Sequence, residues 1–176
     1  MGVPRPDGFF GNCDPKNKKN YRTRCSALIS VGNYNILIDT SPDLRQQLLA
    51  KKITSIDEVL FTHMHADQTH GINDLRVFFL KKKKKIPIHC DSMTSKYFYR
   101  NFAYCFNKKY DYPAILSLKK LKKNFSLGYG NNKVNIKAIE VRHGLISSIA
   151  YILNNKIAYV SDANELYQKD FKHFKE

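Results

Sequence analysis

The apolar residues of this chain occur mostly in short runs that alternate with polar positions, which is the two-residue period of half-buried β-strands. Turn-forming pairs such as Gly32-Asn33 and Asn154-Asn155 separate neighbouring runs, so hairpins are expected there. The expected strands cover residues 25–31, 35–39, 56–61, 86–90, 134–141, 146–153 and 157–160. The pattern therefore predicts a protein built largely from β-strands.

A second set of segments carries apolar residues at the spacing of helices. The expected helices cover residues 41–51 and 92–104, with a short one after residue 74 and a polar one over 165–176. Residues 1–21 and 110–123 follow neither period, and they predict a loop and a Lys-rich irregular connection. Strands and helices together indicate the α+β class.

Length and composition are those of one folded domain. The chain has 176 residues, 43% of them hydrophobic and 12% aromatic, which argues against wholesale disorder. The four cysteines are widely spaced and predict free thiols rather than a disulfide framework. Because no apolar run approaches the roughly 20 residues of a membrane span, we expect a cytoplasmic protein without a membrane partner.

The net charge of +15 favours a negatively charged partner. Nucleic acid is one candidate, since clustered Lys and Arg neutralise phosphates. The sharpest cluster, residues 81–85, is first of all typical of a solvated helix end or loop. The charge fits a small phosphorylated substrate equally well, and we favour that partner.

The strongest chemical signal lies between the strand at 56–61 and the helix after residue 74. There His63, His65 and Asp67 occupy a strand-to-helix turn, where their side chains can converge on one point. Two imidazoles and a carboxylate suit a divalent ion such as zinc, manganese or iron. The spacing therefore predicts a metal site.

The run Thr62-His63-Met64-His65-Ala66-Asp67 is similar to the signature of the metallo-β-lactamase-fold hydrolases, His-x-His-x-Asp-His, except that Gln68 replaces the last His. The flanking segments 38–45 and 71–76 resemble the branch that contains phosphoribosyl 1,2-cyclic phosphate phosphodiesterase. This resemblance implies an αββα sandwich. It also implies that residues 1–176 form a single partial domain, which begins inside a glycine-rich turn and ends before the last metal-binding histidine.

The resemblance further implies two divalent ions, zinc or manganese. His63, His65 and His143 would hold the first ion, while Asp67 would hold the second and Asp162 would bridge the two. Asp67 could also position the attacking water, and so act in catalysis.

Three neighbouring positions are less settled. Gln68 would be a neutral, weaker ligand of the second ion, so that site is expected to be weak, and His70 is an alternative ligand. In the family, an aspartate at the position of Asp39 lies beneath the metals and orients a histidine ligand. On spacing alone, Asp39 could instead be a polar strand end that caps the next turn.

The function implied is a metal-dependent hydrolase, a phosphodiesterase that uses a metal-bound hydroxide on a cyclic or small phosphodiester. Ribonuclease Z-like RNA processing is an alternative, and a non-catalytic remnant of the fold is another. If strands at both ends are absent, exposed sheet edges would favour a homodimer.

Overall fold

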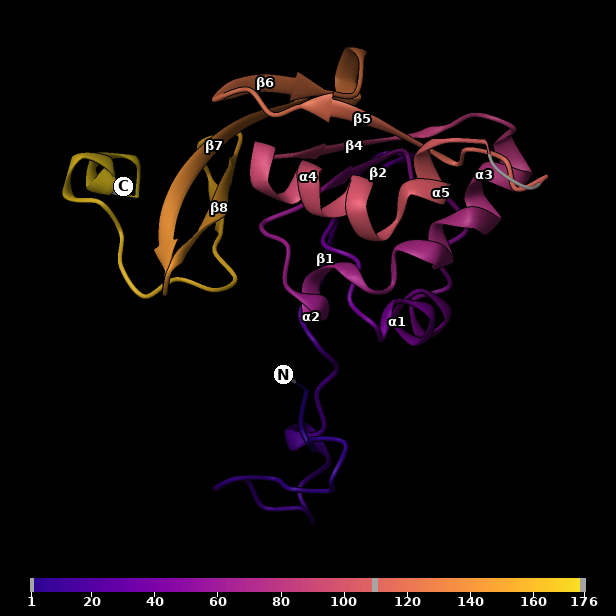
Figure 1. Cartoon of the computed structure of the whole chain (residues 1–176). Helices are drawn as coiled ribbons and strands as arrows, with labels where there is room; N and C mark the ends of the chain where they lie inside the picture. Colours follow the sequence, from indigo (N-terminus) through magenta and orange to yellow (C-terminus); the bar gives the residue numbers. More distant parts are fainter. Residues whose placement is uncertain (1, 109–110, 175–176) are drawn as a thin grey trace.

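The computed structural model describes residues 2–108 and 111–174, and its described strands form two sheets (Figure 1). The first sheet has the order β1-β2-β3-β4-β5, in which β1 and β2 are antiparallel and β2 to β5 run parallel. Its strands are β1 (Ala27–Val31), β2 (Tyr34–Ile38), β3 (Glu58–Leu60), β4 (Ile86–Cys90) and β5 (Leu116–Lys120). Since parallel strands end at the same edge, the residues that follow β2 and β3 lie side by side.

The second sheet is antiparallel throughout, with the order β6-β7-β8-β9. Its strands are β6 (Asn124–Leu127), β7 (Val134–His143), β8 (Ile146–Leu153) and β9 (Ile157–Tyr159). The long hairpin of β7 and β8 pairs His143 with Ile146, so its turn carries His143 at one end of the sheet.

Helices cover the first sheet on the side away from the second sheet (Figure 1). They are α1 (Leu44–Ala50), α2 (Ala66–Thr69), α3 (Arg76–Lys82), α4 (Ser92–Asn101) and α5 (Ala103–Phe106). The described residues also contain four short 3₁₀ segments, of which η2 joins α2 to α3: η1 (Lys18–Asn20), η2 (Ile72–Leu75), η3 (Gly130–Asn132) and η4 (Gln168–His173). No described helix is both long and apolar enough to cross a membrane.

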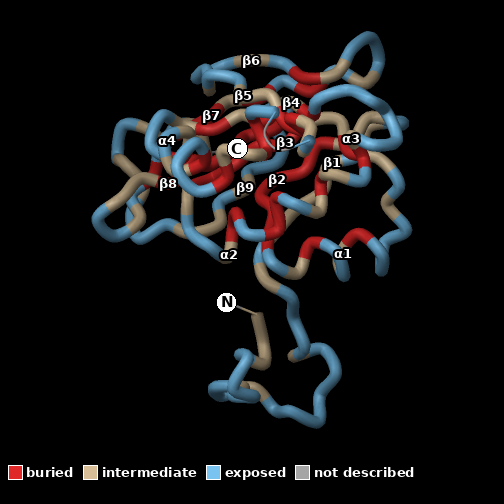
Figure 2. The backbone as a smooth tube through the Cα atoms, turned by 45° about the vertical axis from the view of Figure 1, so that its right-hand side comes forward, coloured by how far each residue is buried: buried red, intermediate tan, exposed pale blue. Residues whose placement is uncertain are grey.

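The alternation of side chains along β2 divides the core into layers. Leu37 faces the helices and packs in the cluster that contains Phe98, whereas Ile36 and Ile38 face the second sheet and pack in the cluster that contains Tyr151. All five side chains are buried, and Figure 2 shows buried residues concentrated in the strands. Two packed sheets with helices outside the first confirm the α+β class and an αββα sandwich that is incomplete, as predicted for a partial domain.

The outer face of the second sheet is less covered than that of the first. Ile139, Val141, Ala150 and Ile152 form a small cluster there, and partly buried apolar residues from the segment around η4 pack against it. Within the described residues no α-helix lies on this face. The fold therefore has one complete helical layer.

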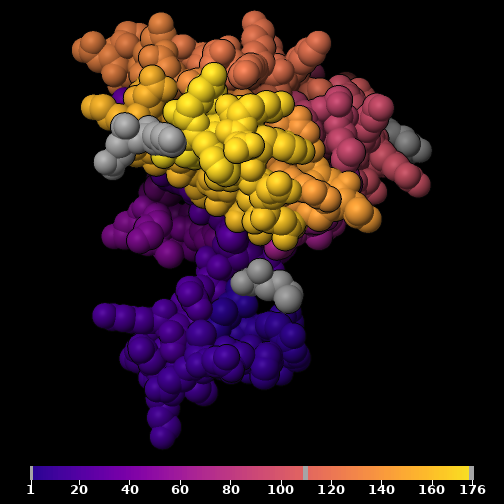
Figure 3. All heavy atoms as spheres, turned by 90° about the vertical axis from the view of Figure 1, so that its left-hand side faces the viewer, coloured from indigo at the N-terminus to yellow at the C-terminus, as the bar shows by residue number. Residues whose placement is uncertain are grey.

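The N-terminal segment projects from the sandwich, as Figures 1 and 3 show from two directions. An isolated bridge between Val3 and Arg22 closes it on itself. Arg24 connects it to the sandwich, because its guanidinium lies 2.5 Å from a carboxylate oxygen of Asp43 and its backbone N–H donates to the other oxygen at 2.7 Å. The predicted loop over residues 1–21 is confirmed for residues 2–21, apart from the single turn η1.

Three predictions of local structure were wrong. The connection expected over 110–123 contains β5, whose run Leu-Ser-Leu-Lys-Lys is too short and basic to stand out. β6 was missed altogether, and residues 109–110 lie outside the described residues. The polar helix expected over 165–176 is only the 3₁₀ segment η4, with residues 175–176 undescribed.

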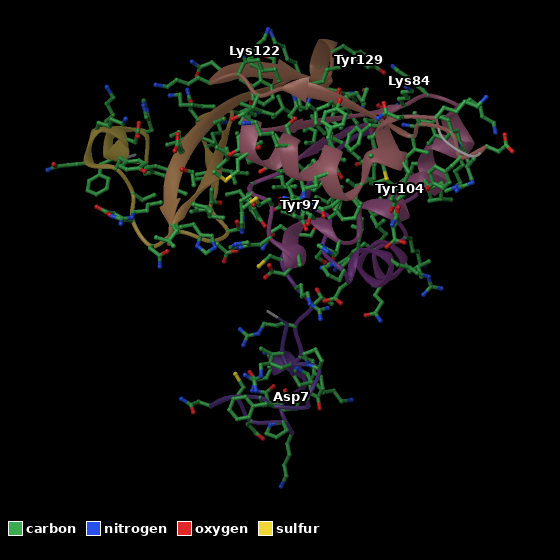
Figure 4. The ribbon with its side chains drawn as sticks, in the orientation of Figure 1. Asp7, Lys84, Tyr97, Tyr104, Lys122 and Tyr129 are labelled. Carbon is green, nitrogen blue, oxygen red and sulfur yellow. The ribbon has the colours of Figure 1, made fainter. Side chains whose placement is uncertain are left out.

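Other predictions hold. The described cysteines Cys13, Cys25, Cys90 and Cys105 are all free thiols. The lysine run ends α3, where Lys83 takes a left-handed conformation and all five lysines are exposed. Figure 4 places Lys84 at the outer edge of the molecule, as expected of a solvated helix end.

Phe98 tests the packing between α4 and the first sheet. Its ring is fully buried and meets Phe61 edge-on, with ring centroids 4.6 Å apart. We expect Phe98→Ala to lower the free energy of unfolding by about 3–5 kcal/mol, because the removed ring leaves a cavity. Leu49→Ala, at a position 62% exposed, should change it by less than about 0.5 kcal/mol. Denaturant unfolding of both variants measures this, and equal effects would contradict the layer assignment.

Candidate metal centre

Three histidines from distant parts of the chain converge at one edge of the sandwich. His63 follows β3, His65 caps the start of α2, and His143 is the last residue of β7. One ring nitrogen from each lies within 4.8 Å of the other two. The turn places His63 and His65, but only the packing of the two sheets brings in His143.

The spacing of the ring nitrogens suits a tetrahedral ion. Nε2 of His63 lies 3.1 Å from Nδ1 of His65, and Nε2 of His143 lies 3.2 Å from the same atom. Two ligands bonded to one zinc ion at 2.0–2.1 Å are separated by roughly 3.3 Å across a tetrahedron edge. Two of the three nitrogen separations therefore already have nearly the length that a shared ion requires, and the third lies within 4.8 Å.

A chain of hydrogen bonds from Asp39 through Thr62 reaches Nδ1 of His63, the ring nitrogen away from the other two histidines. The carboxylate of Asp39 accepts from the backbone N–H and from the hydroxyl of Thr62, both at 2.8 Å. The hydroxyl oxygen of Thr62 lies 3.0 Å from Nδ1 of His63. The Thr62 hydroxyl donates its single hydrogen to Asp39, so toward His63 it can only accept, from an Nδ1–H. This tautomer leaves the Nε2 lone pair free to bind a metal.

Asp39 thus acts on a histidine, as the family resemblance implies, but it does so through Thr62. Its backbone is left-handed, with φ of 60°, a conformation that costs free energy in a non-glycine residue and is often found at functional sites. Burial raises the pKa of Asp39 to about 8, and the hydrogen bonds from Thr62 act in the opposite direction. Asp39 therefore ends β2 and also accepts two hydrogen bonds from the residue that precedes His63.

Two serines that the sequence did not point to complete this support. The hydroxyl of Ser148, on β8, lies 3.4 Å from Nδ1 of His63, and Ser161 donates to the Thr62 hydroxyl at 3.2 Å. Ser148 is buried in β8, where Ser147 is the other serine and the remaining residues are Ile, Ala, Tyr and Leu. In the sequence, a serine within a run of apolar strand residues is the signal that could have identified Ser148.

Asp162 and Gln68 lie together on the far side of His63. A carboxylate oxygen of Asp162 is 3.6 Å from Nε2 of His63 and accepts from the side-chain amide of Gln68 at 3.1 Å. Gln68 is fully buried, and among the described side chains its Oε1 is the one buried polar atom that lacks a hydrogen-bond partner. An orphaned amide oxygen beside a carboxylate is an unused ligand atom, so the residues present fit a second ion.

The turn places His70 elsewhere. Its ring packs edge-on against Phe102, with centroids 5.4 Å apart, and its Nδ1 lies 3.1 Å from the hydroxyl of Thr69. His70 is absent from the convergent histidine group, whereas Gln68 adjoins Asp162. Asp67, which immediately precedes Gln68 in the first turn of α2, is half-buried. The geometry favours Gln68 over His70 as the additional ligand.

His89 forms a separate arrangement. Its Nε2 lies 2.9 Å from a carboxylate oxygen of Glu58, and its ring stacks on Phe125 between the two sheets. These contacts agree with the structural role expected from its isolation in the sequence. His89 is consequently a suitable control for the metal centre.

Burial lowers the pKa of His63 to about 4, from an ordinary value of 6.5, and the neighbouring His65 adds to the effect. The unfolded chain therefore binds a proton at higher pH than the folded chain does. The stability contributed by His63 is present above about 6.5 and is lost as pH falls toward about 4. In metal-free protein, we expect NMR titration to show the His63 ring still neutral between these values.

His63→Gln should remove that resonance and flatten the acid dependence of the unfolding free energy over the same range. If instead all histidine rings become protonated together near 6.5, the burial of His63 is wrong. The measurement does not involve activity.

Metal content tests the ligand set and its support. We expect His63→Ala to abolish tight zinc binding, because it removes the most buried ligand. Asp39→Asn should weaken zinc binding by roughly 10–100-fold, since residues that orient a ligand typically contribute that much. His89→Ala should bind zinc like the unaltered protein. Elemental analysis and zinc titration measure all three, and wild-type affinity in His63→Ala would refute the site.

Comparison with known proteins agrees with this geometry. A family model described as "Beta-lactamase superfamily domain" matches residues 34–174. The structure of a diphosphatase from the PhnP family superposes with a TM-score of 0.81 at 23% identity, over 98% of this chain and 64% of that one. Human tRNase Z, short form, superposes with a TM-score of 0.62 at 17% identity, over 84% of this chain and 66% of that one. At these identities, the superpositions establish the fold.

A curated protein is also similar in sequence. An octanoyltransferase of Porphyromonas gingivalis is 27% identical over 175 residues, which are 99% of this chain and 35% of that protein. The chain thus spans about a third of that relative and 64% of the diphosphatase.

Proposed function

Because this chain belongs to the metallo-β-lactamase superfamily, in the branch similar to the PhnP family, we propose that it is a metal-dependent phosphodiesterase. The observation that carries the proposal is the convergence of His63, His65 and His143 with nitrogen separations of 3.1 and 3.2 Å. Asp162 lies next to them, 3.6 Å from Nε2 of His63. We assign the three histidines to the first ion and Asp67, Asp162 and Gln68 to the second, with zinc or manganese as the metal.

Divalent ions at such a centre lower the pKa of water and neutralise the charge that develops on phosphate oxygens. The chain's own residues supply orientation and exclusion of water. Thr62 and Ser148 hold His63 in a buried position that is only 1% exposed, while His65 is exposed and His143 half-buried. The centre therefore has a closed side toward the sandwich and an open side toward solvent, from which a substrate can approach. Asp67 is our candidate for positioning the attacking water.

The proposed substrate is a small or cyclic phosphodiester. The net charge of +15 supports an anionic substrate, because it would attract one electrostatically. Two of the structural neighbours are a diphosphatase and a tRNase by name, which suits chemistry at phosphorus. The second of them keeps RNA processing as the alternative. RNA binding measured at several salt concentrations would separate these candidates, since binding to many phosphates weakens steeply with salt.

Gln68 is compatible with such a site. A superposed metallo-β-lactamase from Cronobacter sakazakii, with a TM-score of 0.52, is described by the motif HARLDQ, and that motif ends in Asp-Gln as Asp67-Gln68 does here. The neutral amide should nevertheless bind its ion more weakly than an imidazole would. We therefore propose that the second ion is the more readily lost.

A metal titration of the hydrolysis rate tests this function. With a generic phosphodiester as substrate, we expect hydrolysis to require added Mn²⁺ or Zn²⁺. Gln68→His should lower the metal concentration needed by roughly 10–100-fold, because an imidazole replaces the amide. His63→Ala should be inactive at every concentration.

His70→Ala is the matched control, since it removes a histidine from the same turn that packs on Phe102. It should need the same metal concentration as the unaltered protein. If His70→Ala lost activity like His63→Ala while Gln68→His changed nothing, the assignment of the second ion would be wrong. Absence of hydrolysis under all conditions would favour a non-catalytic role for the fold.

A homodimer also remains a proposal. β9 is an edge strand of the second sheet, and Ile157 on it is 63% exposed. An unpaired edge with an apolar residue can pair with another chain. Sedimentation of the purified protein would decide, and a monomer at all concentrations would exclude it.

A further inference from the structure

An open groove lies between α1 and α3, on the helical side of the first sheet. Its cavity volume is about 730 Å³, and residues of both helices, of the turn after α1 and of η2 line it. In Figure 1 both helices lie on the right-hand flank of the molecule. None of the residues that line the groove belongs to the convergent histidine group. The groove is therefore a surface that the candidate metal centre does not use.

The groove has an apolar lining that is partly open to solvent. Leu48 and Phe78 are buried, at 9% and 3% exposed, and form its floor. Leu49, Val77 and Leu80 also line it, but they are 62%, 48% and 42% exposed. Single exposed apolar residues are ordinary on a protein surface, whereas a contiguous group of them is typical of an interaction site. The groove therefore has the character of a docking surface.

Helical spacing explains why these side chains stay outside the core. Val77 and Leu80 are three positions apart on α3 and share one face of the helix, while Phe78 faces inward and packs in the core cluster of the helical layer. On α1, Leu49 follows Arg45 by four positions and shares a face with it. Two neighbouring helices thus present apolar residues to the groove between them, which is the form that accepts a third helix.

The charges around the groove are mostly positive. Asp74 is the one acidic residue among those that line it, and the basic residues that line it are Arg45, Lys52, Arg76 and Lys81. The Cζ atom of Arg76 lies 4.1 Å from the ring centroid of Tyr112. The ion pairs of the described residues leave the other three basic side chains without a carboxylate partner. An apolar floor and a positively charged rim are therefore combined in one surface.

We propose that the groove between α1 and α3 binds an amphipathic helix of a partner protein, in which acidic residues flank an apolar stripe. Apolar side chains of that helix at positions i, i+3, i+4 and i+7 would pack against the exposed apolar residues of the groove. Its carboxylates would pair with the unpaired basic side chains of the rim. Charge complementarity of this kind speeds association and discriminates against other partners. This role is independent of the proposed function.

Two other occupants fit the groove less well. A second copy of this chain also carries a net charge of +15, and a two-fold interface would set the same basic rim against itself. An anionic membrane would suit the charge, but its flat surface would leave a concave groove unfilled. A helix offers a ridge of side chains that fits between two others.

Fluorescence anisotropy with the full chain tests the interaction. The probe is a labelled, designed helix of about 18 residues, with leucines in the stripe and glutamates on both sides of it. Leu49→Ser combined with Leu80→Ser should raise the Kd of the probe at least roughly tenfold, because two apolar contacts are lost. Arg45→Glu combined with Lys81→Glu should raise it by a similar factor, since the rim then repels the probe. All four positions are exposed, so folding should be preserved.

Matched controls come from the opposite side of the molecule, where Figure 4 shows Lys122 and Tyr129 far from α1. Lys120→Glu combined with Lys122→Glu makes the same change in net charge at two exposed lysines. Tyr129→Ser removes a large side chain that is 70% exposed. Both controls should bind the probe like the unaltered protein.

Several results would overturn the proposal. They are an equal loss of binding in the charge control, equal binding of a probe with the same residues in scrambled order, and no binding at a probe concentration of about 1 mM. Partition onto phosphatidylglycerol vesicles that needs Leu49 and Leu80, without probe binding, would assign the groove to a membrane. Self-association that needs the same two residues, without probe binding, would assign it to a second copy. Because the assay involves neither metal nor hydrolysis, its outcome leaves the proposed function unaffected.

Discussion

The hydrogen-bond chain from Asp39 through Thr62 to His63 is the constraint on which this structure depends. It joins the ends of β2 and β3 and selects the tautomer of His63 that leaves Nε2 available. All three residues are almost completely buried, so their polar groups must be satisfied by one another. The same contacts that stabilise the edge of the sheet also prepare the ligand.

The sandwich then turns this local arrangement into a site. The first sheet supplies His63 and His65 from one turn, and the second sheet supplies His143 from the end of β7. The backbone N–H of Ile149 on β8 donates to the oxygen of Thr62 at 2.9 Å, which fixes the two sheets against each other beside the histidines. Ser148, next to it, meets His63. The convergence of the three histidines therefore depends on the packing of the two sheets.

The two ends of the Gln68 side-chain amide are in different environments. Its amide nitrogen is bonded to Asp162 while its oxygen has no partner, so the group fits a weak ligand better than a core residue.

Period and motif in the sequence alone determined most strands, the helical layer and the turn that carries His63, His65 and Asp67. These features depend on neighbouring residues, and the alternation of apolar positions records them directly. β5 and β6 were not predicted, because runs as short as Leu-Ser-Leu-Lys-Lys and Asn-Phe-Ser-Leu form strands only when adjacent strands pair with them. Only the tertiary structure decided that Asp39 contacts His63 through Thr62, that Ser148 lies against His63, and that Gln68 rather than His70 adjoins Asp162. Each of these contacts joins residues brought together by sheet packing or by the direction of one turn, and no local pattern in the chain encodes such a distance.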